Sequence, residues 1–221
     1  MGRAAKPAAK AAPRMYDAEQ SMADIMKVAT AEFADKGLSG ARIDEIAAAT
    51  RTSKRMIYYH FGSKEGLYLA VLEASYQRIR EIEARLELED LPPEDALRKL
   101  VAFTFDYQHD NEDFIRLVMN ENIHRGENIA QLTSLVDLNS PAIELISRIL
   151  ERGRHQGLFR GDVDAIDVHM MISAYCFFRV GNRHTFGAIF GRDMLDPKRR
   201  NHYKQILGDM VAGHLTSPAV R

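Results

Sequence analysis

The chain has 221 residues, which fits one domain or a small domain joined to a larger one. Its 46% hydrophobic and 28% charged residues are ordinary for a folded, water-soluble protein and exclude wholesale disorder. A single cysteine excludes an internal disulfide framework and a multi-cysteine metal site, which suits a reducing cytoplasm. The longest apolar stretch, residues 168–180, is shorter than the roughly 20 residues of a membrane-spanning helix. We therefore expect a cytoplasmic protein with no membrane partner.

Charge is distributed unevenly along the chain, although the net charge is only −1. Residues 1–64 carry 11 Lys and Arg against 7 Asp and Glu, whereas the remainder is acidic. A basic front on an acidic body suggests nucleic-acid contact at the front. Residues 1–16 contain four basic residues, several alanines and two prolines, which predicts a disordered basic arm. The arm either adds phosphate contacts or is an inert solvated tail.

The pattern after residue 16 is helical. Apolar residues from Met22 to Phe33 recur every three or four positions and form one helix stripe, which Gly37 ends. Two short helices follow, one at residues 43–47 and one at residues 54–60. Ser63 then begins a long helix at about residues 64–88.

The second half also lacks the alternation of a strand and predicts helices throughout. Pro141 takes the first position of a helix capped by Ser140, and Asp196-Pro197 opens the last helix. Residues 168–180, in the helix that Asp164 opens, are apolar nearly all round and must be covered on several sides. Further segments are predicted at residues 94–109, 113–124 and, more weakly, 128–136. We predict an all-α fold in which the helices after residues 164 and 196 pack inside one subunit or, as we favour, against a second copy.

Residues 43–61 have the spacing of a helix-turn-helix. Ser53 is the expected N-cap of the second helix, and Ile57 and Phe61 are expected to face the core. The other faces carry cationic, aromatic and hydroxyl side chains, which suit phosphate oxygens and base edges. The alternative is a solvated basic helix in an unrelated bundle.

The run YYHFGSKEGLYLAVLE at residues 58–73 resembles the DNA-binding domain of TetR-type transcriptional regulators. Ala29, Phe33, Gly37 and Ile46, with Ala47, Ser53 and Lys54, extend the resemblance over residues 18–75. It implies a DNA-binding domain at residues 17–77 and a helical ligand-binding and dimerisation domain at residues 78–221. It further implies a homodimer that binds double-stranded DNA at a near-palindromic operator, usually as a repressor that a small molecule releases.

The resemblance also assigns roles to individual residues. Lys64 corresponds to a phosphate contact, and Ile57 and Phe61 correspond to core positions. The residues expected at DNA are Arg42, Arg51, Thr52, Ser53, Lys54, Arg55, Met56, Tyr58, Tyr59, His60 and Lys64.

Four of these positions depart from the family pattern. Arg51 replaces the usual glycine of the turn, which costs on the order of 1 kcal/mol if its backbone is left-handed. Arg42 replaces the Ser or Thr cap of the first reading helix. Arg55 and Met56 replace glycine and threonine, so Arg55 is our candidate for a base-reading residue and Met56 for contact with a thymine methyl group.

Two segments of the C-terminal body, residues 117–126 and 177–194, resemble regulators linked to the catabolism of aromatic or heteroaromatic acids. A ligand pocket between helices has apolar walls and a few polar anchors, and an arginine suits a carboxylate. The expected walls are Phe103, Tyr107, Phe114, Met119, Met170, Tyr175 and Phe178, and the expected anchors are Asn120, His124, Arg179, Asn182 and Arg183. The plainer reading is that these are core residues and surface ion pairs.

Other functions have weaker signals. The eight histidines lack metal-ligand spacing, and Cys176 lies in the most apolar helix, so we expect no metal, no cofactor and no redox role. The sequence contains neither a phosphate-binding loop nor a nucleophile motif of the kind that enzymes use, so we do not expect an enzyme. The alternative function is a helical interaction module, or a small-molecule-binding protein, without specific DNA binding.

Overall fold

The computed structural model describes residues 14–217, which contain ten α-helices, two short 3-10 helices and no strand. The all-α prediction is confirmed. The chain divides into two compact units, Met1–Tyr68 and Leu69–Arg221. Most of the expected basic arm, residues 1–13, lies outside the described residues, and helix α1 begins at Arg14 rather than after residue 16.

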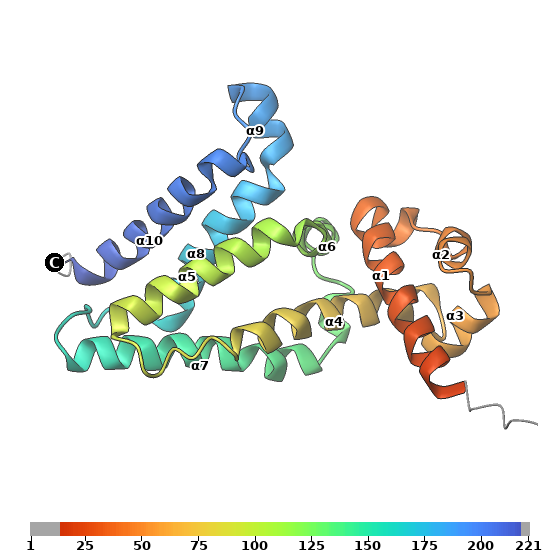
Figure 1. Ribbon diagram of the computed structural model, residues 1–221, viewed down its shortest axis with the longest axis horizontal. Helices are drawn as coiled ribbons and strands as arrows, with labels where there is room; N and C mark the ends of the chain where they lie inside the picture. Colours follow the sequence, from red (N-terminus) through yellow and green to blue (C-terminus); the bar gives the residue numbers. More distant parts are fainter. Residues whose placement is uncertain (1–13, 218–221) are drawn as a thin grey trace, which may run out of the picture. The chain divides into compact units, whose positions relative to one another are not determined.

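The first unit contains three helices and the first turn of a fourth (Figure 1). They are α1 (Arg14–Gly40), α2 (Ile43–Ala49), α3 (Lys54–Phe61) and the start of α4 (Lys64–Glu83). Gly37 has a positive φ of 66° and interrupts α1, so the predicted stop is confirmed. Fully buried side chains from all four helices form this unit's core, and the rings of Phe33 and Tyr68 meet edge to face with centroids 5.0 Å apart.

The turn between α3 and α4 is packed too tightly for a side chain at Gly66. A Cβ atom there would lie 2.1 Å from the carbonyl oxygen of Phe61. The Gly66 amide donates to Ser63 Oγ over 3.0 Å, which confirms Ser63 as the cap of α4. Glycine at this position of the YYHFGSKEG run therefore has a steric cause.

The second unit contains the rest of α4 and the remaining helices (Figure 1). Helix α5 packs against α7, α8 and α10, and α6 packs against α8. The bounds are α5 (Pro93–Asp110), α6 (Glu112–Ile123), α7 (Ser134–His155), α8 (Ala165–Gly181), α9 (Arg183–Phe190) and α10 (Arg200–Thr216), with 3-10 turns at Ile129–Gln131 and Pro197–Arg199.

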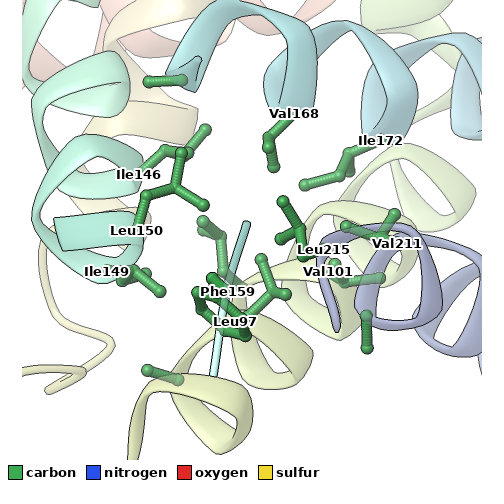
Figure 2. Packing of buried hydrophobic residues seen from close by; sticks show 14 of the residues in the cluster. Leu97, Val101, Ile146, Ile149, Leu150, Phe159, Val168, Ile172, Val211 and Leu215 are labelled. Carbon is green, nitrogen blue, oxygen red and sulfur yellow. The ribbon is translucent and has the colours of Figure 1, made fainter. Parts of the chain in front are cut away.

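The core of the second unit lies where α5, α7, α8 and α10 meet. Figure 2 shows the labelled side chains of these helices converging, with Phe159 from the α7–α8 connection among them. The labelled residues are Leu97, Val101, Ile146, Ile149, Leu150, Phe159, Val168, Ile172, Val211 and Leu215.

Helix α7 begins earlier than the sequence predicts. Pro141 is the eighth residue of this helix, so the prediction of a helix beginning at Ser140-Pro141 was wrong. Proline removes the amide that would bond to the carbonyl of Asp137, but Pro141 is exposed, where water can satisfy that carbonyl. Ser140 Oγ donates to the Val136 carbonyl over 2.9 Å and occupies a neighbouring acceptor.

Helix α4 ends at Glu83, five residues before the predicted end. Glu87 has a positive φ of 48°, and the chain turns so that Leu88 enters the core. Arg152 on α7 donates to the carbonyls of Leu88 and Leu91, which holds the turn in place. An arginine some 60 residues later in the chain thus fixes this boundary, which local sequence does not reveal.

Helix α8 is covered on one side only within the chain. Its N-terminus has the predicted cap, in which the Asp164 and Asp167 side chains accept from each other's amides. Val168, Ile172 and Cys176 are buried, whereas the stripe formed by Ile166, Met170, Ala174 and Phe178 is exposed.

Candidate DNA-binding and effector sites

A short turn positions α3 against α2. The Thr52 amide donates to the Ala47 carbonyl over 3.0 Å, and Ser53 Oγ accepts from the Met56 amide over 3.2 Å, which confirms the predicted N-cap. Ile57 is fully buried and anchors one face of α3. Arg51 has a φ of 54°, so its backbone is left-handed.

The rest of α3 faces solvent. Tyr59 is 79% exposed, and Met56 and Tyr58 are each more than 40% exposed. Of the other residues expected at DNA, Arg42, Arg51, Ser53, Lys54 and Arg55 are exposed, and Thr52, His60 and Lys64 are half-buried. Phe61, which was expected in the core, is half-buried as well.

The cations around α3 differ in their partners. Lys54 forms an ion pair with Asp44 at the start of α2. Lys64 Nζ donates to the carbonyls of Ser39 and Ala41, over 3.4 and 3.2 Å. Within residues 14–217, the guanidinium groups of Arg51 and Arg55 have neither a hydrogen-bond nor an ion-pair partner.

Arg42 lies at the N-cap of α2 without capping it through its side chain. Its own amide donates to Glu32 Oε1, and Asp44 and Glu45 occupy the first turn, where their charge complements the helix dipole. The Arg42 side chain is therefore free to point into solvent.

The first unit presents a short exposed helix with unpaired arginines, tyrosine hydroxyls and a neighbouring lysine. Guanidinium groups bind guanine edges and phosphates, and hydroxyl groups bind phosphates. A helix of this kind, supported by a second helix across a tight turn, defines a helix-turn-helix DNA-binding protein.

Two family models match the chain. The model described as bacterial regulatory proteins, tetR family, matches residues 25–71. The model described as tetracyclin repressor-like, C-terminal domain, matches residues 93–211. The chain belongs to the TetR family of helix-turn-helix transcriptional regulators.

Curated relatives agree with this assignment. The chain is 34% identical over 202 residues to the HTH-type transcriptional repressor NicS of Pseudomonas putida, which covers 91% of this chain and 95% of the relative. It is 49% identical over 57 residues to the HTH-type transcriptional repressor SCO4008 of Streptomyces coelicolor, covering 26% of this chain and 30% of the relative. The second match is confined to about a quarter of the chain.

Solved structures share the fold. A bacterial regulatory protein in the tetR family from Rhodococcus RHA1 has a TM-score of 0.67 at 21% identity, covering 87% of this chain and 97% of that one. The regulator FadR from Bacillus subtilis, solved in complex with stearoyl-CoA, has a TM-score of 0.63 at 15% identity, covering 84% and 97%. At these identities the likeness concerns the fold alone.

The second unit brings some of the predicted effector residues together. The rings of Phe103, Tyr107 and Phe114 follow one another, with centroids 5.9 and 6.1 Å apart. Tyr76 on α4 continues the row, 5.3 Å from Phe114. Burial and the carboxylate of Glu121 raise the pKa of Tyr76. The sequence analysis missed Tyr76 because it lies within the long linking helix and reaches the row only through its tertiary contact with Phe114.

A surface hollow of about 410 Å³ adjoins Tyr76. Its other lining residues come from the segment at residues 129–139, which the sequence predicts only weakly. Ile129 and Asn128 are held by the buried carboxylate of Glu121, which accepts from the Ile129 amide over 2.8 Å. The hollow includes none of the nine main effector-site residues predicted from the sequence, which are Phe103, Tyr107, Asn120, His124, Tyr175, Phe178, Arg179, Asn182 and Arg183.

The two arginines proposed as anchors differ sharply. Arg183 begins α9 and donates to Glu112 Oε2 over 2.5 Å. Arg179 is only 3% exposed, and no carboxylate of residues 14–217 pairs with it; its Nη1 donates to His109 Nδ1 and to the Met194 carbonyl, each over 3.0 Å. Among the predicted anchors, Arg179 is therefore the buried cation.

The remaining predicted residues are scattered over other surfaces. His124 is exposed and its Nδ1 bonds to the Asn120 carbonyl over 2.8 Å. Phe178 is half exposed and its ring lies 6.0 Å from that of Phe186. Tyr175 is half-buried on α8, and Asn182 caps the C-terminus of that helix.

Metal sites and membrane-spanning helices are both absent from residues 14–217. No group of three His, Cys, Asp or Glu side chains there has a geometry that could hold a metal ion. In the same range, no helix combines the length and the hydropathy needed to cross a membrane. Cys176 is fully buried, and burial raises the pKa of its thiol to about 12.

Proposed function

We propose that the chain is a homodimeric repressor that binds a near-palindromic operator and leaves it when a small aromatic acid binds. The observation that carries the proposal is the exposed face of α3 in a chain similar, over nearly its whole length, to a curated repressor. The DNA contacts, the dimer and the effector each have separate support.

The DNA contact rests on α3 and its turn. Arg55 and Arg51 are exposed and unpaired within the described part of the chain, so neither gives up an internal ion pair on meeting DNA. Arg55, near the N-terminus of α3, is placed as the base-reading residue, since recognition helices read bases from that end. Tyr58, Tyr59 and Ser53 contact the phosphate backbone and some bases, and Met56 contacts a thymine methyl group.

The dimer rests on the apolar stripe of α8 and its neighbour α10. Ile166 is 63% exposed, Met170 61% and Phe178 49%, and Met210 on α10 is 56% exposed. Burying such a stripe against its own two-fold copy would produce the isologous interface typical of homodimers. A dimer also matches a two-fold operator, whose half-sites lie about 34–36 Å apart.

A ligand can release the protein from DNA only if it binds the released conformation more tightly than the DNA-competent one. The proposed effector is a small aromatic acid bound in the second unit, where the aromatic row from Phe103 to Tyr76 and the buried Arg179 lie. Coupling of about 1–3 kcal/mol is typical of such systems, and DNA must weaken the ligand by the same factor.

A gel shift with the DNA upstream of the protein's own gene tests the proposal directly. We expect a specific complex that contains two chains in analytical ultracentrifugation and weakens steeply with salt. Between 50 and 200 mM salt the affinity should fall by roughly 10³–10⁵ if 6–10 phosphates are neutralised. Failure to bind, with correct folding, would instead favour a helical binding module without specific DNA binding.

A further inference from the structure

Arg179 is a buried cation without a compensating anion. Its guanidinium group lies over the Phe105 ring, 3.9 Å from the centroid. Nη1 has two neutral partners, the His109 ring and the Met194 carbonyl, whereas Nε and Nη2 are buried and have no hydrogen-bond partner in the described part of the chain. A buried charge that lacks both an opposite charge and full hydrogen bonding is costly to a fold.

The acidic side chains nearby are already occupied. Arg200 on α10 donates to Asp106 over 2.9 Å and to both carboxylate oxygens of Asp110, over 2.8 and 2.7 Å. Lys204 also pairs with Asp106. The carboxylates of Asp106 and Asp110 are thus neutralised by Arg200 and Lys204, and neither carboxylate compensates the charge of Arg179.

The other neighbours of Arg179 are neutral. Burial, followed by the charges of Arg179 and Arg200, lowers the pKa of His109, so its imidazole accepts the bond from Nη1 as a neutral ring. Burial raises the pKa values of Cys176 and Tyr175, which lie one turn earlier on α8. None of these groups supplies negative charge near neutral pH.

The vacant Nε and Nη2 form the edge of the guanidinium group that binds carboxylates in pairs. The chain itself shows this geometry at Arg160, whose Nε and Nη2 donate to the two oxygens of Asp162 over 2.6 and 2.7 Å. A carboxylate placed in the same way on Arg179 would complete its hydrogen bonding and leave both Nη1 bonds intact.

A second unpartnered group lies on the neighbouring helix. The Tyr203 hydroxyl group on α10 is buried and has no hydrogen-bond partner among the residues that the structure describes, and α10 packs against α5 and α8. Tyr203 and Tyr175 interact electrostatically, and Lys204, the next residue, lies 6.0 Å from the same Phe105 ring. A hydroxyl group is a suitable additional donor to a carboxylate.

We propose that the effector's carboxylate binds the Nε and Nη2 edge of Arg179, with the Tyr203 hydroxyl group as a further donor, and that Arg183 takes no part. This inference rests on the proposed function, because it identifies the anion with the effector. The Met194 carbonyl accepts from Nη1 and Met194 is 6% exposed, so the loop at residues 191–196 must open for the acid to enter and close again once it is bound.

The test is isothermal titration calorimetry on the full-length chain, with benzoate as the charged probe and benzamide as its neutral counterpart. We expect benzoate to bind at least about tenfold more tightly than benzamide, since charge-assisted hydrogen bonds are the stronger kind. Arg179→Gln should weaken benzoate by at least about tenfold, and Tyr203→Phe should weaken it by several-fold. Arg183→Gln is the matched control and should leave the affinity unchanged.

Tyr203→Phe keeps the ring and removes only an unpartnered hydroxyl group, so it remains informative if Arg179→Gln fails to fold. No benzoate binding up to about 10 mM, a range that covers weak millimolar ligands, would overturn the proposal. Equal affinities for benzoate and benzamide, or wild-type benzoate affinity in folded Arg179→Gln, would overturn it too. The gel shift is scored separately: operator binding without benzoate binding refutes the anion site alone, and benzoate binding without operator binding refutes the proposed function alone.

Discussion

Arg51 offers a test in which backbone strain and DNA contact can be separated. Its φ of 54° places an L-residue in the left-handed region, which costs roughly 1–2 kcal/mol for a residue other than glycine. The side chain is exposed and has no partner within the described residues, so its removal breaks no internal contact. Arg51→Gly should therefore relieve strain in the turn between α2 and α3.

The expected gain is smaller than the strain. Glycine also makes the unfolded chain more flexible, which offsets about 0.4–1 kcal/mol of the relief. We expect a net stabilisation of about 0.5–1 kcal/mol, which corresponds to exchange of protected amides that is slower by a factor of about two to five. The amide of Thr52, bonded to the Ala47 carbonyl, is a suitable reporter in native-state hydrogen exchange.

Arg51→Ala is the matched control, because it removes the same charge but keeps the Cβ atom. Both variants should reduce the salt dependence of operator binding, by about one phosphate contact per subunit. Only Arg51→Gly should slow exchange. Equal exchange in the two variants would refute the strain argument, and a wild-type salt slope in both would refute the phosphate contact.

Four further predictions concern other positions. Arg55→Ala should cost about 1–3 kcal/mol of operator binding and relax the preference at one base pair per half-site, which binding selections would reveal; unchanged preference would contradict base reading. Lys64→Ala and Lys64→Gln both remove the phosphate contact, so gel shifts should show weaker binding to all DNA sequences alike. Only Lys64→Gln retains a donor for the Ser39 and Ala41 carbonyls, so hydrogen exchange should be less disturbed in it than in Lys64→Ala. Met170→Glu should dissociate the dimer in ultracentrifugation, while Ser140→Glu on the exposed side of α7 should not. Burial and then Arg80 lower the pKa of His169, so urea unfolding should show stability that is complete above about pH 6.5 and falls below it, and His169→Gln should flatten that fall.

Local signals in the sequence correctly predicted the caps of three helices and the break in α1. Ser53, Ser63 and Asp164 each accept from the amide three residues later, and this bond depends only on neighbours in the chain. Gly37 carries the positive φ that its position predicts. The resemblance of residues 18–75 likewise located the reading helix and its turn.

Features that depend on distant partners escaped prediction. Pro141 looks like a helix start, but the core contacts of Leu135 and Ala142 keep α7 continuous across it. Helix α9 lies in a stretch whose apolar residues remain mostly exposed in the single chain, so it has no amphipathic pattern directed at a core. Tyr76 joins the aromatic row only because α4 and α6 bring it to Phe114.

Arg179 and Arg183 show most clearly what sequence leaves open. They lie four residues apart on consecutive helices, and from the sequence alone they are equal candidates to hold a carboxylate. Tertiary structure separates them, because Glu112 neutralises Arg183, while the carboxylates near Arg179 are taken by Arg200 and Lys204. An arginine already paired gains little from a second anion, whereas a buried arginine with a vacant donor edge gains both charge and hydrogen bonds. The choice of anchor is thus set by the partners of the surrounding residues.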